Sequence, residues 1–329
     1  MAWAYPVART LMASALALLS ITNATAAQSA RAYPERPIRL LIAQAPGGNA
    51  DIIARALADG LAERLGQSIV ADNRPGASGI IATETTVRAA PDGYTILLVP
   101  SSFGVNPAVT RKLPYDQLRD LTPITLVASA PNVLVVGPAL PIKSVADLVK
   151  AAKANPGKLT YGSSGNLGSP HLAGELFELM TGTDMVHVPY KGAATAMVDL
   201  IGGRISLSFA SLPSAISHIR GGRLTAIAVT SEKRWTAMPN LPSVAESGYP
   251  GFDVYVWVAF FAPAGTPRTI IDRIAGDTAK ALESSEVKER FAAASIETGA
   301  STPESLATFL RKDFELWDKV IKSQGIKLD

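Results

Sequence analysis

A pair of glycines between an apolar segment and an amphipathic one is the feature that most constrains this chain. Residues 38–42 form a short apolar run typical of a buried strand, and a turn follows at 45–48. The apolar residues after the turn recur every four positions, which is the period of a helix: Ile53, Leu57, Leu61 and Leu65. A strand, a glycine turn and a helix in this order open an α/β unit.

Such a turn can hold an anion. The N–H groups of the first helical turn and the positive end of the helix dipole point beyond the carboxyl end of the strand. Gly47 and Gly48 carry no side chain that would keep a ligand from the backbone. The sequence therefore predicts an anion seat at this turn. A tight turn that only requires positive φ is the alternative, and the sequence leaves it open.

The same pattern recurs along the chain. Strands are expected at 68–71 and 94–99, followed by the glycine-rich segment 72–79 and by Ser101. In the second half, strands at 158–161 and 186–189 precede turns at 162–168 and 190–194. Strands that alternate with helices predict a parallel-type α/β sheet in each half.

Two β-rich runs, at 121–137 and 255–262, are expected to cross between two domains. The first domain comprises 32–130 plus 252–329, and the second comprises 131–251. Two linkers make a hinge, which places the ligand site in a cleft between two lobes. The C-terminal helices have no expected strand between them and should pack on the first domain's sheet.

Several helix starts are marked by hydroxyl residues, which commonly cap the first turn. The apolar stripe of the last helix is Leu306, Leu310, Phe314, Trp317 and Ile321. The expected N-caps are Ser78, Ser144, Ser169, Thr266 and Thr302.

Composition narrows the class of protein. The chain has 329 residues, is 47% hydrophobic and 18% charged, and carries a net charge of only +3. Its basic residues are dispersed, so no nucleic-acid partner is expected. The absence of cysteine excludes a disulfide framework and the thiol that a lipid anchor would need.

Residues 1–27 read as a secretory signal peptide. Arg9 precedes a short apolar run, and Ala24-Thr25-Ala26 is a small-residue cleavage pattern. The run is too short to span a bilayer, so a freely diffusing periplasmic protein, monomeric by default, is expected. An anchor helix that is never cleaved is the alternative.

The residues give little support for catalysis or for a metal or cofactor. Gly162-Ser163-Ser164-Gly165 is one residue short of a hydrolase nucleophile elbow. His171 and Glu175 lie four apart on one helix face, which suits a hydrogen-bonded pair better than half a metal site. Neither nucleotide-binding glycine motif is present. No catalytic residue, metal or cofactor is therefore predicted, although a serine–histidine pair within hydrogen-bond reach in a cleft would favour an enzyme.

What is left is a set of neutral donors at the strand ends of both halves, which could hold a carboxylate by charge-assisted hydrogen bonds. Asp51 would repel an anion and is expected to order the glycine turn. Lys191 is either a counter-charge or a solvated turn residue, and His171 and Tyr190 either line the cleft or only pack. The predicted site residues of the first half are Gln44, Ala45, Gly47, Gly48, Asn49, Ala50, Asp51, Ser78, Gly79 and Ser101. Those of the second half are Ser163, Ser164, Gly165, Asn166, His171, Tyr190, Lys191, Gly192 and Ala193.

Six segments, in the same order along the chain, resemble those of a known family. The chain resembles the Bug family, the periplasmic solute-binding receptors of tripartite tricarboxylate transporters. The resemblance implies a type II periplasmic-binding-protein fold that closes on a small carboxylate, held by the loops at 45–51 and 163–166, often with bridging water. The segments are YPERPIRLLIAQAPGGNADIIAR, NRPGASG, APDGYTILL, YGSSGNLGSPHLAGELF, HVPYKGAATAMVDLIGGRI and PAGTP.

The chain departs from the family pattern beside the first loop. Members commonly have Pro-Phe where this chain has Ala43-Gln44, and often Thr or Ser where it has Ala50. No named ligand is transferred across these changes. We expect a non-enzymatic receptor that captures a small organic carboxylate and delivers it to membrane transporter subunits. An extracytoplasmic sensor that docks on a signalling ectodomain is the alternative.

Overall fold

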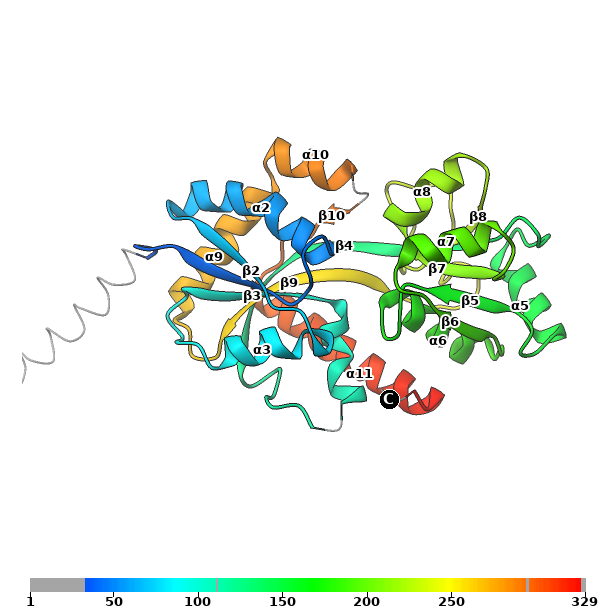
Figure 1. The fold of residues 1–329 in the computed structure, drawn as a ribbon, viewed down its shortest axis with the longest axis horizontal. Helices are drawn as coiled ribbons and strands as arrows, with labels where there is room; N and C mark the ends of the chain where they lie inside the picture. The colour runs from blue at the N-terminus through cyan, green and yellow to red at the C-terminus, as the bar shows by residue number, and fades with distance from the viewer. Residues whose placement is uncertain (1–32, 111, 294–295, 327–329) are drawn as a thin grey trace, which may run out of the picture.

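The computed structural model describes residues 33–110, 112–293 and 296–326 of the chain. The predicted signal peptide at 1–27 lies outside these ranges. Figure 1 shows two lobes side by side, with long strands running between them. None of the described helices has the length and apolar character that a bilayer span requires.

The first lobe has a parallel sheet at its centre, with strand order β2-β1-β3. The predicted stripe of α2 is confirmed, since all four of its residues are at most 4% exposed in the core. The elements of this part of the chain are β1 (Ile38–Ile42), α2 (Asn49–Leu65), β2 (Ile69–Asn73), η1 (Ala77–Gly79), α3 (Ile80–Val87), β3 (Thr95–Pro100), η2 (Ser101–Gly104) and α4 (Asn106–Val109).

The second lobe repeats this arrangement around β5, which pairs in parallel with β6 on one side and β7 on the other. The parallel-type sheet predicted for each half is thus present. Its elements are α5 (Val145–Ala154), β5 (Thr160–Ser163), α6 (Ser169–Thr181), β6 (Val186–Pro189), α7 (Ala193–Ile201), β7 (Leu207–Ser211), α8 (Leu212–Arg220) and β8 (Thr225–Val229).

Two antiparallel strands connect the lobes: β4 (Leu121–Val136) and β9 (Tyr255–Pro263). The first part of β4, up to Pro131, pairs with β9, and β9 pairs with β3 of the first lobe. From Asn132 onwards, β4 pairs with β7 and β8 of the second lobe. The chain therefore crosses between Pro131 and Asn132, close to the predicted linker. The predicted limits of the two domains stay a prediction.

The helix starts confirm two of the five predicted caps. Ser144 and Thr302 accept hydrogen bonds from the third residue after them. The prediction of Ser78 as a cap was wrong, because Ser78 lies within η1 with a left-handed φ of 54° and Gly79 is the N-cap of α3. Ser169 is the first residue of α6, after Gly168 as N-cap, and Pro267 rather than Thr266 precedes α9.

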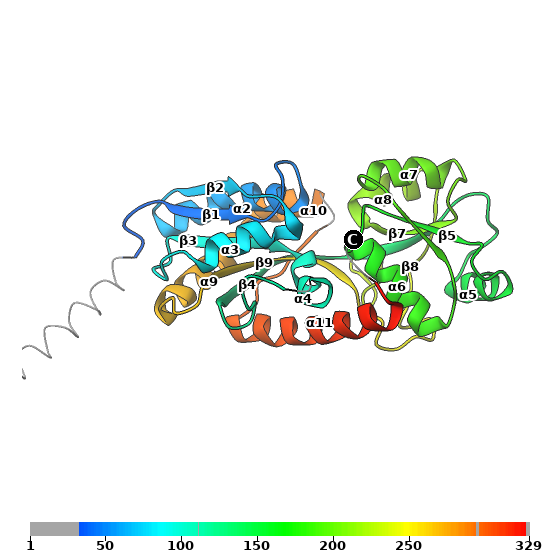
Figure 2. The same cartoon turned by 60° about the horizontal axis from the view of Figure 1, so that its bottom comes forward.

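The C-terminal segment contains α9 (Arg268–Leu282), α10 (Ser285–Ala293), β10 (Glu297–Thr298) and α11 (Pro303–Gln324). The expectation of no strand between these helices was wrong, since β10 pairs with β4. Helix α11 also reaches beyond the first lobe (Figure 2). Leu306 and Leu310 belong to a core cluster with β3 and β9, whereas Trp317 and Ile321 belong to one with α6 and β7.

Asp313 lies on α11 between these two core clusters. Its Oδ1 accepts a hydrogen bond of 2.9 Å from the indole of Trp317. Burial raises the pKa of this carboxyl to about 7, against the smaller lowering effect of the hydrogen bond from Trp317. The folded protein therefore binds a proton here more tightly than the unfolded chain, whose aspartate titrates near its ordinary value of about 4.

Asp313→Asn is expected to remove a pH-dependent loss of stability. Because the folded pKa is raised, stability falls as the pH rises from about 4 to about 7, by about 1.4 kcal/mol for each pH unit. The asparagine keeps the oxygen that accepts from Trp317. Its melting temperature should exceed that of the unmodified protein at pH 8 and approach it at pH 5. An equal difference at both pH values would show that Asp313 is charged in the fold.

Candidate functional site

The loop before α2 is closed by hydrogen bonds to its own backbone amides. Gly47 N donates to Asp51 Oδ2 at 2.9 Å, Gly48 N to the Ala45 carbonyl at 3.1 Å, and Ala50 N to Gln44 Oε1 at 2.8 Å. These three amides were predicted as donors for a ligand. In this structure each already has an acceptor within the loop, so this seat is not a set of free backbone amides.

Asp51 organises this loop, as the sequence indicated. It is 3% exposed. Besides Gly47, it accepts from Arg55 Nε at 2.9 Å and from Asn73 Nδ2 at 3.0 Å. Burial, the largest single effect, raises the pKa of Asp51, but the hydrogen bonds from Arg55, Gly47 and Asn73 outweigh it and hold the pKa below its ordinary value. The carboxylate is therefore charged at neutral pH and is matched by Arg55.

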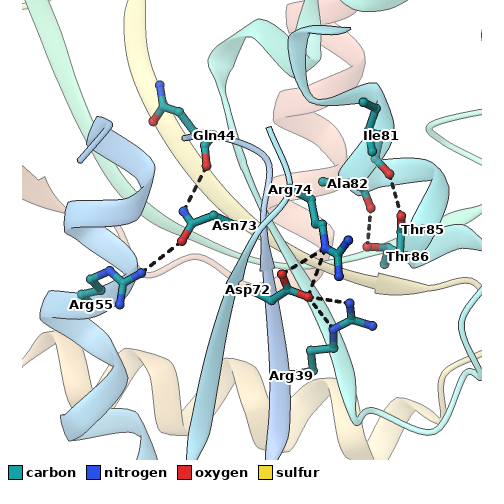
Figure 3. Close-up of polar contacts among 10 residues, drawn as sticks. All are labelled: Arg39, Gln44, Arg55, Asp72, Asn73, Arg74, Ile81, Ala82, Thr85 and Thr86. Atoms are coloured by element: carbon teal, nitrogen blue, oxygen red, sulfur yellow. Dashed lines mark hydrogen bonds and ion pairs between the residues drawn. The ribbon is translucent and has the colours of Figure 1, made fainter. Parts of the chain in front are cut away.

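Asn73, at the end of β2, ties the neighbouring strand end to the same loop. Its Nδ2 also donates to the Gln44 carbonyl at 3.0 Å, and its Oδ1 accepts from Arg55 at 3.0 Å, as Figure 3 shows. Asn73 was not among the predicted site residues, although its place two residues after the predicted strand 68–71 was a signal. The side chain of Gln44 itself lies across Gly48, where a Cβ would come within 2.5 Å of its Cδ.

The other first-lobe residues lie around this loop. Gly79 has a φ of 90°, and a Cβ there would lie 3.1 Å from that of Ala43. Ser78 is exposed, and its carbonyl accepts from Asn106 Nδ2 at 3.1 Å. Ser101 is half-buried at the start of η2. The strand ends of β1, β2 and β3 therefore meet at one edge of the first lobe.

The second-lobe loop is built on Ser163. Its side chain is 1% exposed, and its hydroxyl donates to the Gly165 carbonyl at 2.9 Å and accepts from Gly165 N at 3.2 Å. Tyr190 N donates to the Ser163 carbonyl at 3.0 Å, which brings the loops after β5 and β6 together. Ser164 and Asn166 are exposed at the loop surface.

Residues 190–193 form the second turn of this lobe. Tyr190 donates its hydroxyl to Asp199 at 2.8 Å, so its hydroxyl is held by α7. Lys191 is exposed. Gly192 has a φ of 140° with open space around the position of a Cβ, and Ala193 begins α7.

His171 is 5% exposed, beneath the loop. Its Nε2 lies 3.2 Å from Glu175 Oε1, which is the hydrogen-bonded pair that the sequence favoured. Nowhere in the described part of the chain does a group of three or more potential metal ligands occur.

A serine–histidine pair is present, formed by a histidine that the sequence analysis did not select. His187 Nε2 lies 2.7 Å from Ser163 Oγ. Burial, with the neighbouring His171, lowers the pKa of His187 to about 4. The carboxylate nearby, Glu175, is bonded to His171 and Tyr161 instead. In the register of β5 and β6, His187 lies opposite Tyr161, which brings His187 next to Ser163. This register cannot be read from the sequence.

A small apolar pocket lies between the lobes. Helix α2 and the second-lobe segment 211–213 contribute to its wall, and β4 and β9 form its base. It holds about 20 Å³, room for a water molecule or little more. None of the predicted site residues lines it, but Ile53 lies one helical turn after Asn49, and Ser211 ends the strand beside β5. Its lining is Ile53, Ala128, Ser129, Ala130, Pro131, Ser211, Pro213, Val256, Val258 and Ile296.

The described geometry is that of a two-lobed periplasmic-binding fold: two α/β lobes with glycine-rich strand ends, joined by two crossing strands. The family model described as "Tripartite tricarboxylate transporter family receptor" matches residues 53–326. The chain belongs to this family, whose receptors are periplasmic.

Two relatives are similar in sequence to this chain over almost its whole length. Protein BugT of Bordetella pertussis is 39% identical over 323 residues, which cover 96% of this chain and 99% of BugT. A UPF0065 protein from the tcbD-tcbE intergenic region of Pseudomonas sp. strain P51 is 37% identical and covers 96% and 94%.

Solved structures show the same fold. R. palustris Rpa4515 with adipate has a TM-score of 0.76 at 36% identity, covering 90% of this chain and 99% of that one. The periplasmic binding protein BugD has a TM-score of 0.73 at 32% identity, covering 90% and 99%. MatC from Rhodopseudomonas palustris with bound malate has a TM-score of 0.73 at 26% identity, covering 88% and 100%.

Proposed function

We propose that this protein is a periplasmic receptor, monomeric and exported by cleavage of residues 1–27, that binds a small organic carboxylate between its lobes. The observation that supports the proposal is that both lobes line one apolar pocket, which includes Ser211 at the end of β7. At about 20 Å³ this pocket marks where the lobes meet and is too small to enclose the acid itself. Both lobes must contact the ligand, because a ligand can shift an open–closed equilibrium only through different affinities for the two states.

Gln44 is the first-lobe group best placed to hold the carboxylate. Its Oε1 accepts from Ala50 N, so its Nε2 is the end of the amide that stays available as a donor. On the second lobe, the exposed Ser164, Asn166 and Lys191 offer a hydroxyl, an amide and a charge. We infer that the ligand is held mainly through these side chains.

The apolar surface that the two lobes present to each other around this small pocket favours an acid with an apolar body. Among its ten lining residues only Ser129 and Ser211 are polar, and none is charged. A ligand hydroxyl placed there would lose its hydrogen bonds to water without regaining them all. Adipate, a dicarboxylate with four methylene groups, fits this pattern, and galactarate is the same chain with four hydroxyls.

Organic acids are expected to stabilise the protein against heat. An acid at about a hundred times its Kd adds about 2.7 kcal/mol, which raises the melting temperature by about 5 °C or more. A thermal-shift series should show adipate above malate and galactarate, and no shift with adipamide, which keeps the body and removes both charges. Stabilisation by adipamide or by sugars, with none by any acid, would contradict the proposal.

Delivery to membrane transporter subunits is the second part of the proposal. It rests on the family membership. Deleting the gene should abolish uptake of the radiolabelled acid that binds. Unchanged uptake, with altered transcription in response to that acid, would assign the sensor role instead.

An enzyme is less well supported, although Ser163 and His187 lie within hydrogen-bond reach. The single hydroxyl proton of Ser163 is directed at the Gly165 carbonyl, so His187 is the donor in this pair and has no lone pair facing the serine. A nucleophilic serine needs the opposite arrangement. The Ser163 side chain is also closed off from a substrate by burial.

A further inference from the structure

Two histidine rings lie stacked directly behind the second-lobe loop. The ring centroids of His171 on α6 and His187 on β6 are 3.9 Å apart, and their planes differ by 18°. One ring contacts the start of the loop 163–167 and the other contacts its end. The titratable groups around the pair are Glu175 and Glu178 on α6 and Tyr161 on β5.

His171 holds the end of the loop. Leu167 N donates to His171 Nδ1 at 3.0 Å, and Leu167 has a φ of 60°, in the left-handed region that a leucine rarely occupies. Nδ1 must therefore be unprotonated. The proton is on Nε2, which faces Glu175 Oε1 at 3.2 Å. Glu175 Oε1 also accepts from the Tyr161 hydroxyl, so the ring is fixed from both sides.

His187 holds the start of the loop. Ser163 has one hydroxyl proton, and the Gly165 carbonyl accepts it. The contact of 2.7 Å between Ser163 Oγ and His187 Nε2 is then completed by the proton of His187. The lowered pKa of His187 keeps this ring neutral at pH 7, with its proton on Nε2.

We propose that His171 and His187 are positioning residues that set the conformation of the loop 163–167 for a carboxylate ligand. The proposal rests on the proposed function for its effect on affinity. The two rings act at opposite ends of one loop through different atoms: Nδ1 accepts at His171, and Nε2 donates at His187. This difference makes the two positions separable by substitution.

Matched asparagine and glutamine variants test the proposal. The oxygen of asparagine can take the place of imidazole Nδ1, and the amide nitrogen of glutamine can take the place of Nε2. His171→Asn keeps the acceptor for Leu167 and His171→Gln loses it. His187→Gln keeps the donor for Ser163 and His187→Asn loses it. All four remove the ring stacking. Because the same two amides are used at both positions, an effect of side-chain size alone would give the same order of affinities at both.

We expect the asparagine variant to bind more tightly than the glutamine variant at position 171, and the reverse at position 187. With adipate as probe, calorimetry should give about tenfold weaker binding for His171→Gln and His187→Asn than for their partners, the effect of about one hydrogen bond. Hydrogen exchange in the unliganded protein should be faster at Leu167 in His171→Gln than in His171→Asn. Nitrogen NMR should show Nε2-protonated neutral rings for both histidines.

The proposal would be overturned if the same amide, asparagine or glutamine, gave the weaker binding at both positions. A role in packing alone depends on side-chain size, which would favour the same amide at both. Equal exchange at Leu167 in both His171 variants would also overturn it, without any ligand present. If adipate does not bind the unmodified protein while the exchange rates differ as expected, the positioning role stands and the choice of adipate as ligand fails.

Discussion

Gln44→Glu is expected to weaken the binding of organic acids about a hundredfold or more and to leave the protein at least as stable as before. The glutamate keeps an oxygen where Gln44 Oε1 accepts from Ala50 N. It adds a negative charge at the N-terminus of α2, which stabilises a helix by about 0.3–1 kcal/mol. The same charge replaces the amide donor and repels a carboxylate, so affinity should fall about a hundredfold or more, which is about 2.7 kcal/mol.

Calorimetry with adipate and a thermal melt without ligand measure the two effects separately. Gln67→Glu is the matched control, since it makes the same charge change beyond the opposite end of α2 and should leave binding unchanged. Gln44→Met removes both the acceptor and the donor, and should lose stability and affinity together. Undiminished binding by Gln44→Glu would show that the carboxylate lies elsewhere.

Gly174→Ala is expected to have the largest effect on stability. An alanine normally stabilises a helix interior relative to glycine. Here a Cβ would overlap the ring of Tyr161, lying 2.6 Å from its Cζ. Tyr161 is fully buried, and its hydroxyl is bonded to Glu175. The ring has to move into a packed core, which costs about 3 kcal/mol and is measured by chemical denaturation.

Gly276→Ala provides the comparison, because the same substitution in α9 meets open space. It should stabilise the protein by about 0.5–1 kcal/mol. Tyr161 also lies against His187, with ring centroids 5.0 Å apart, so Gly174→Ala should weaken acid binding as well. If both variants were equally stable, the Tyr161 ring would have room that the structure does not show.

The architecture could be predicted from the sequence because helices and buried strands place apolar residues in regular patterns along the chain. The stripe of α2 and the long apolar run of β4 each correspond to one continuous element. The short strand β10 was missed, since two residues paired through their backbone leave no side-chain pattern. Ser78 was misassigned as a cap because its left-handed φ depends on the turn that precedes it.

The candidate site was predictable only to the level of its loops. The turns at 45–48 and 163–166 lie at strand ends as expected. The occupation of Ala50 N by Gln44 involves a side chain six residues away, and no local pattern specifies its rotamer. Likewise, His187 meets Ser163 only through the pairing of β5 with β6. Such contacts depend on tertiary structure, which a single sequence does not encode in its spacing.

Helix α11 restricts how such a receptor can open. Because its first turns are anchored in one lobe and its last turns in the other, with Gln324 donating to the Glu175 carbonyl at 3.2 Å, the halves have a third tether beside the crossing strands. Separating the lobes along the direction of this helix would pull Trp317 from its core. A change in the angle between the lobes therefore has to carry α11 with both of them, or release Trp317 and Gln324 from the second lobe.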